Sequence, residues 1–483
     1  MTKAVPLSDS EAPISGEAPG LGNSLKSRHV AMIAIGGIIG AGLFVGSSTS
    51  IATVGPAVIV SYAIAGLIVL LIMRMLSEMA MAVPSVRSFP EFARYGLGHW
   101  AGFLSGWLYW YFWVVVVAIE AIAGAVIVHG WLPGIPVWQI GVGLMALLTL
   151  VNLLSTRSYG EFEFWFSSIK VAAIVVFILI TGVYAFGGTS SAPTFANLTS
   201  HGGFAPFGWS AVFAGVTSVV FALVGAEIAT IAAAESAEPA RTVARMTSSV
   251  ATRILFFYIL SMTLIVAIVP WNDVTPGSSP FTQVLDVIGI PGAALAMNIV
   301  ILIAVLSCLN SGLYVTSRVL FVLAARGDAP QWLVSVNRRQ VPARAILIGS
   351  LFSYIALFAS VVSPQLVFSF LVNASGALML IIYLMIAGAQ VRLRYRFERT
   401  DPARLVLRMW LFPGLSFAAM AAIAAILVAM AVTPSLASQF YSSVAITLLF
   451  SALFFLFRRG KPVHGMVDQG ATESRSLPAY NEG

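Results

Sequence analysis

Four ionisable side chains lie inside long apolar segments, which makes them the residues best placed to do chemistry: Glu120, Lys170, Glu227 and Glu235. A charge in a membrane span costs at least about 2.5–3.5 kcal/mol, so each needs a partner, an aqueous cavity or a position near a span end. Glu227 and Glu235 are eight residues apart, which is about 12 Å along a helix and on roughly one face. This spacing fits a proton route or a gate, unless Glu235 is simply interfacial.

Lys170 is the most exceptional of the four, because the apolar run VAAIVVFILI follows it directly. An ammonium group held in a span can exchange a proton, and it can also occupy the place of a sodium ion. A structural tie between two helices is the alternative. Glu120, within VVVVAIEAIAG, is equally deep and is expected to face the interior of a helix bundle.

The segment 35–46, IGGIIGAGLFVG, has five glycines where a membrane helix should be most regular. Glycine weakens a helix by about 1 kcal/mol relative to alanine, and backbone groups freed in hydrocarbon need new partners. The segment therefore predicts a broken helix, of the kind that offers N–H groups to a substrate carboxylate in secondary transporters. Close packing of two helices through small residues such as Gly36 and Gly40 is the alternative.

The composition is that of an integral membrane protein. Of the 483 residues, 59% are hydrophobic and only 9% are charged, against roughly 25% charged in soluble domains. The net charge of +7 is spread through connections rather than gathered on one face, which argues against nucleic acid as a partner. The single cysteine, Cys308, lies in an apolar run, so no disulfide framework exists.

Apolar runs long enough to span a bilayer predict an all-α polytopic protein with twelve transmembrane helices. Residues 1–26 are expected to be a disordered cytoplasmic tail, 27–460 the transporter domain, and 461–483 a second disordered tail. The expected helices cover about 29–50, 55–82, 99–131, 136–154, 161–187, 208–235, 247–270, 288–325, 343–362, 365–390, 406–432 and 437–457.

Basic residues occupy every second connection and both tails, whereas the alternate connections contain no Lys or Arg. Because basic residues near span ends stay in the cytoplasm, this alternation predicts a multi-pass membrane protein with both termini in the cytoplasm. Inside the second span, Arg74 and Glu78 are four residues apart and are expected to form an i,i+4 pair.

The first and sixth spans share a feature that predicts internal symmetry. The sixth span carries FALVGAE (221–227), which again places a glycine near a polar residue at mid-membrane. Phe221 is either a candidate lid over a small ligand or a residue of the packed core. These two spans must run in opposite directions, as an inverted repeat of helices 1–5 and 6–10 requires, with the site where the two breaks meet. Helices 11 and 12 lie outside the repeat.

The sequence shows no pattern typical of an enzyme. Its five histidines are scattered, and no nucleophile stands near a base at a recognisable spacing. We therefore expect no catalytic residue, no metal site and no cofactor. The aromatic run GWLYWYFW (106–113) is typical of packing or of interface anchoring.

Several motifs resemble the bacterial amino acid permeases of the amino acid, polyamine and organocation superfamily, and among them most of all the γ-aminobutyrate (GABA) permeases. The likeness covers about residues 25–465. The motifs are LKSRHVAMIAIGGIIGAGLFVGSS (25–48), GPAVIVSYAIAGL (55–67), MRMLSEMA (73–80), GWLYWYFW (106–113), YGEFEFWFSSIKV (159–171), GAEIATIAAAESAEPART (225–242), SCLNSGLYVTSRVLFVLAARGDAP (307–330) and LRMWLFP (407–413).

This resemblance implies a five-plus-five inverted-repeat fold in the bacterial inner membrane and uptake driven by the proton gradient. It also implies a small zwitterionic amino acid as the substrate, GABA first among the candidates, held between helices 1 and 6. Lys170 would stand at the family's sodium-site equivalent, and Glu227 and Glu235 at acidic positions tied to coupling or gating. Glu120 and Ser307 are further candidates. The implied substrate-binding residues are Ile39, Gly40, Ala41, Gly42, Leu43, Phe221, Gly225, Ala226 and Glu227.

One position departs from the family pattern. Many α-amino acid permeases of this group read IGTGLF, whereas this chain reads IGAGLF, with Ala41 in place of the threonine. We expect the loss of that hydroxyl and its bulk to help admit a substrate whose amine lies three carbons from its carboxylate.

Rival interpretations are the same transporter type for proline, an aromatic amino acid or lysine, and, outside that class, a channel, a transporter-like sensor or a membrane enzyme. A channel would need a selectivity ring rather than two broken helices, and a sensor would be expected to carry a further domain. The expected partners are the amino acid, protons and membrane lipid, and the sequence does not indicate an oligomeric state.

Overall fold

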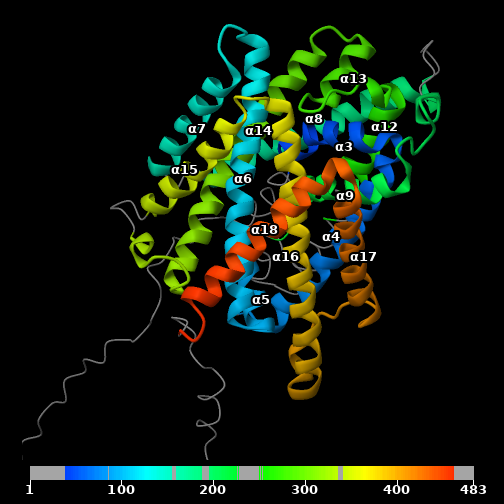
Figure 1. Ribbon diagram of the computed structural model, residues 1–483. Helices are drawn as coiled ribbons and strands as arrows, with labels where there is room; N and C mark the ends of the chain where they lie inside the picture. The colour runs from blue at the N-terminus through cyan, green and yellow to red at the C-terminus, as the bar shows by residue number, and fades with distance from the viewer. Residues whose placement is uncertain are drawn as a thin grey trace, which may run out of the picture.

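The computed structural model describes residues 39–84, 86, 88–154, 159–187, 195–225, 227, 250, 252, 254–335 and 341–461. Every regular element in these ranges is a helix, and Figure 1 shows a bundle of long helices. Seven helical stretches are long and apolar enough to cross a membrane, the first of them covering Ala41–Ala82, and four shorter apolar helices accompany them. The prediction of an all-α polytopic membrane protein is confirmed.

The helices follow one another with short connections. In chain order they are α2 (Ala41–Phe44), α3 (Gly46–Val54), α4 (Val58–Ala82), α5 (Phe89–Leu97), α6 (His99–Trp131), α7 (Val137–Leu154), α8 (Tyr159–Phe186), α9 (Gly208–Leu223), the π-helix η3 (Ile254–Leu260), α12 (Ser261–Ile268), α13 (Pro280–Ile288), α14 (Ala293–Ala325), α15 (Ala343–Ala359), α16 (Pro364–Thr400), α17 (Gly414–Val432) and α18 (Pro434–Phe457).

Most predicted spans have a counterpart within a few residues, and α6 has the predicted bounds. The larger differences lie where glycine or proline sets a boundary. The predicted helix 288–325 corresponds to α14, which begins only at Ala293, because Gly289 and Gly292 take φ near +76° and separate it from α13, a helix that was not predicted. In the other direction, α16 runs ten residues past its predicted end at 390, until Asp401-Pro402 stops it.

Helix α5 was not predicted, because nine residues with mixed charge are too short to read as a span. It is amphipathic and buries Phe89 and Phe92. Gly96 brings it close to α16, since a Cβ at that position would come within 2.6 Å of the Cβ of Ala389. Figure 1 shows α5 at the same end of the bundle as the final turns of α16 and α18.

Buried ion pairs hold this end of the bundle together. The side chain of Asp328, just after α14, is fully buried and accepts hydrogen bonds from Arg94, His99 and Arg458, with His99 Nε2 at 2.9 Å and Arg458 Nε at 3.1 Å. One carboxylate thereby joins α5, α6 and α18 to the end of α14.

The expected pair of Arg74 with Glu78 is wrong. Glu78 instead accepts a hydrogen bond from Arg394 Nη1 at 3.0 Å, and another from Gln390, while Arg74 donates to the carbonyl oxygen of Arg408 at 2.7 Å. The reason is the extra length of α16, which brings Arg394 to this carboxylate beside Gln390.

The closest approach of α16 to α9 occurs at Gly376, where a Cβ would lie 1.8 Å from the carbonyl oxygen of Thr217. We expect Gly376→Ala to destabilise the fold by about 1–3 kcal/mol or more, because backbone must move. Gly388→Ala on the same helix is the matched control, since its added Cβ meets only Leu97 at 3.7 Å. Thermal unfolding in detergent should show a lower midpoint for Gly376→Ala alone, and equal midpoints would contradict the prediction.

Candidate functional site

The first interruption lies at the beginning of α2. Gly40 is extended, with φ −138° and ψ −151°, and precedes the single turn of α2. Val45, with φ −121° and ψ −43°, then separates α2 from α3. Every residue from Ile39 to Gly46 is buried. The predicted break in the first span is therefore present in its described part.

The second interruption follows α9. That helix ends at Leu223, after which Val224 is extended and Gly225 takes φ +108°, a backbone conformation that favours glycine. The hydroxyl of Tyr258 donates to the carbonyl oxygen of Ala222 at 3.0 Å, which satisfies an acceptor left by the helix end. The predicted break in the sixth span, 208–235, is therefore present at its glycine. Ala226 and Glu235 lie outside the described residues.

The two interruptions touch each other. A Cβ added to Gly42 would lie 2.7 Å from the Cα of Ala222 and 3.2 Å from the ring of Phe221. The absence of a side chain at Gly42 is therefore what allows α2 and the end of α9 to meet. Phe221 is buried in this contact, between the first interruption and Phe112, whose ring centroid is 6.4 Å away.

Glu120 reaches the first interruption from α6. Its Oε1 and Oε2 atoms accept hydrogen bonds from the amide of Ala41 at 3.1 and 3.0 Å, and it also forms a hydrogen bond with the side chain of Cys308. A carboxylate is therefore already seated on the first turn of α2, where N–H groups lack partners within the helix.

Lys170 lies on the other side of the same region. It is fully buried in α8, and its Nζ donates to Ser307 Oγ of α14 at 2.9 Å. It is also close enough to Glu120 for its charge to act on that carboxyl group. The structure thus brings together three of the sequence candidates, Lys170, Ser307 and Glu120, around the break at Gly40.

Glu227 belongs to the second interruption. It is fully buried, its Oε2 accepts from the amide of Gly225 at 2.9 Å, and its Oε1 accepts from the hydroxyl of Tyr109 at 3.1 Å. This carboxylate therefore caps its own break and ties it to α6.

Sequence reasoning missed two tyrosines at the second interruption, Tyr109 and Tyr258. Tyr109 is part of the aromatic run expected to pack or to anchor at an interface. The available signal was its hydroxyl, because a tyrosine buried in an apolar span needs a hydrogen-bond partner.

Comparisons with known proteins decide the family. The profile of the amino acid permease family matches residues 29–464. The chain is 48% identical over 444 residues to the γ-aminobutyric acid permease of Bacillus subtilis, covering 92% of this chain and 95% of that protein. The chain belongs to the amino acid permease family. This permease is also 45% identical over 423 residues to the γ-aminobutyric acid permease of Escherichia coli, covering 86% of this chain and 90% of that one.

A solved structure supports the fold of this permease. The crystal structure of a mutant manganese transporter from Eremococcus coleocola superposes with a TM-score of 0.55 at 12% identity, covering 89% of this chain and 93% of the other. At that identity the likeness concerns the fold alone. Among the described residues of this permease, no group of three His, Cys, Asp or Glu side chains could hold a metal ion. An amino acid transporter of this family is not an enzyme.

Proposed function

We propose that this permease takes up GABA together with a proton by alternating access, with the substrate held between the two interruptions. The transporter domain would comprise residues 27–460, with twelve spans, an inverted repeat of helices 1–5 and 6–10, and two cytoplasmic tails in the inner membrane. In this account the backbone from Ile39 to Leu43 receives the substrate carboxylate, and the segment from Phe221 to Glu227, including Gly225 and Ala226, faces its amine and the outer gate.

The contact between the two breaks is the observation that carries this proposal. Gly42 lies against Phe221 and Ala222, so the interruption in the first span is in direct contact with the end of α9, next to the second interruption. The Glu120 carboxylate on the Ala41 amide supports the further point that this turn accommodates a carboxylate.

Proton coupling is assigned to Lys170, with Glu227 and Glu235 as coupling or gating residues. The buried contact of Lys170 with Ser307 supports this assignment, because it places an ionisable group beside the break in the first span. GABA carries no net charge, so symport with a proton would move net charge into the cell and make uptake electrogenic.

Counterflow in proteoliposomes tests carrier function and substrate together. Vesicles preloaded with unlabelled GABA should accumulate labelled GABA transiently without an imposed proton gradient. The outward gradient of unlabelled GABA drives this exchange in a carrier, whereas a channel would only equilibrate the label. Excess external GABA should suppress the signal more than proline, lysine or an aromatic amino acid. An aromatic amino acid is the leading alternative substrate, since an aromatic amino acid transport protein of Corynebacterium glutamicum is 37% identical to this chain. Stronger suppression by an aromatic amino acid would reassign the substrate.

We expect the side chain at position 41 to influence which amino acid the permease prefers. Ala41→Thr should shift relative uptake from GABA toward α-amino acids by about tenfold, because added bulk and one more hydrogen bond at the first turn of α2 alter the fit by about 1.4 kcal/mol. The measurement is the ratio of labelled GABA to labelled alanine uptake in matched vesicles. An unchanged ratio would remove Ala41 from the explanation.

A further inference from the structure

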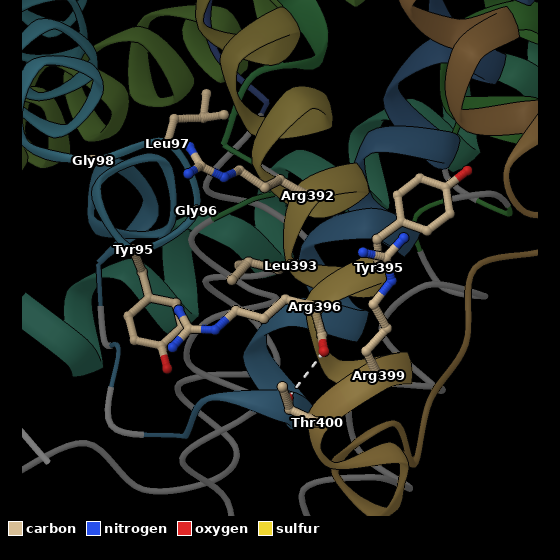
Figure 2. A pocket seen from close by; sticks show the side chains of 10 residues that line it. All are labelled: Tyr95, Gly96, Leu97, Gly98, Arg392, Leu393, Tyr395, Arg396, Arg399 and Thr400. Atoms are coloured by element: carbon tan, nitrogen blue, oxygen red, sulfur yellow. Dashed lines mark hydrogen bonds between the residues drawn. The ribbon is translucent and has the colours of Figure 1, made fainter. Parts of the chain in front are cut away.

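A hollow of about 670 Å³ lies at the end of the bundle where α5 meets the last turns of α16. Arg392, Arg396 and Arg399 line it, and Figure 2 shows the side chains of Arg392 and Arg396 reaching from α16 toward the α5 side. These arginines are spaced four and three residues apart, so they share one face of the helix. All three are exposed.

The pairing of these arginines differs from that of their neighbours. Arg394, on the opposite face, is bound to Glu78 at 3.0 Å and to Glu398 at 2.7 Å. No carboxylate in the described ranges lies within ion-pair distance of Arg392, Arg396 or Arg399. Figure 2 shows the guanidinium groups of Arg392 and Arg396 on the α5 side and the side chain of Arg399 extending toward Tyr395. Three guanidinium groups around one hollow make a strongly positive site that suits a multiply hydrogen-bonding anion such as a phosphate ester.

The surroundings of the hollow place it at the level of lipid headgroups. Tyr395 lines it and contacts the ring of Phe412, with centroids 5.1 Å apart. The connection between α16 and α17 exposes two apolar side chains, Trp410 (42% exposed) and Leu411 (81% exposed). Exposure of such side chains to water is unfavourable. Aromatic residues of this kind mark membrane–water interfaces, and basic residues beside them attract anionic lipids.

We propose that this hollow, lined by Arg392, Arg396 and Arg399, binds the phosphate headgroup of an anionic phospholipid of the cytoplasmic leaflet. The choice of leaflet rests on the proposed function, in which both tails and this end of the bundle face the cytoplasm. Leu97 and Leu393 supply apolar wall beside the arginines, where the glycerol and the first acyl carbons would lie. Gly98 leaves the rim open, since a Cβ there would meet nothing within 4 Å.

Native mass spectrometry of the full-length chain, titrated in detergent with phosphatidylglycerol or phosphatidylcholine, tests this site without reference to transport. The variant R392Q/R396Q/R399Q should lose at least about tenfold in phosphatidylglycerol affinity, because each basic residue near an anionic lipid contributes substantially. The matched control R404Q/R459Q/K461Q removes the same charge from the same end of the bundle, outside the hollow. It should stay within about twofold of wild type, since it leaves those contacts in place.

Three outcomes would overturn the proposal. Equal losses in the two triple variants would indicate only a general surface charge, and undiminished binding by R392Q/R396Q/R399Q would place the lipid elsewhere. Displacement of phosphatidylglycerol by an equal concentration of glycerol 1-phosphate would show that the site takes a free phosphate ester rather than a lipid. Because none of these measurements involves GABA, failure here would leave the proposed transport function untouched, and failure of transport would not account for a loss of lipid binding.

Discussion

Lys170→Ala is expected to abolish the stimulation of GABA uptake by an inward proton gradient. The wild-type chain should accumulate GABA by up to about tenfold per pH unit of gradient at one proton per substrate, since a tenfold ratio corresponds to 1.4 kcal/mol. The variant should only equilibrate GABA. The physical reason is that Lys170 is the buried cation beside the first break, bonded to Ser307 at 2.9 Å. Uptake of labelled GABA in proteoliposomes measures the effect.

Lys170→Arg separates proton exchange from a structural tie between α8 and α14. Arginine keeps the positive charge and can still donate to Ser307, but it does not release its proton. If proton exchange is the role of Lys170, this variant should lose gradient-driven accumulation as completely as Lys170→Ala. GABA counterflow, which needs no proton gradient, should persist in Lys170→Arg and show that the protein is folded. Gradient-driven accumulation at the wild-type level in Lys170→Arg would favour the tie and contradict the coupling role.

Gly42→Ala is expected to reduce both counterflow and gradient-driven uptake, by about 100-fold. The added Cβ would stand 2.7 Å from the Cα of Ala222, so the two interruptions must move apart. A displacement of about 1 Å in a binding site is enough for an effect of this size. Initial rates of labelled GABA counterflow give the measurement.

Gly143→Ala is the matched control, because its added Cβ in α7 would meet nothing within 4 Å. It should transport GABA at the wild-type rate, and both variants should incorporate into vesicles to the same extent. A wild-type rate in Gly42→Ala would show that the close contact of the two breaks is not needed for transport.

The breaks were predictable because their signals are local. Glycines clustered between residues 35 and 46, and the glycine of FALVGAE, stand out against runs of good helix formers. The bounds of α6 were also predictable, because its apolar run ends sharply on both sides. By contrast α5 gives only a weak local signal, since its amphipathic face acquires meaning from the helix against which it packs.

The partners of the buried charges could not be predicted, because they come from distant parts of the chain. Glu120 and Ala41 are 79 residues apart, and Lys170 and Ser307 are 137 apart. The sequence indicated that each charge needed a partner, and only the packing of the helices shows which one it has. For Glu78 the predicted partner, Arg74, was wrong. The prediction considered only a neighbour on the same helix, whereas the actual partner is Arg394 on α16.

The most direct test of the account is labelled GABA uptake by the full-length wild-type chain in proteoliposomes, with an acidic exterior or with equal pH on the two sides. We predict accumulation of GABA above its external concentration only when the exterior is acidic, and collapse of that accumulation when a protonophore is added. GABA that reaches the same level under both conditions would contradict proton-coupled transport, and GABA that does not enter at all would contradict the substrate assignment.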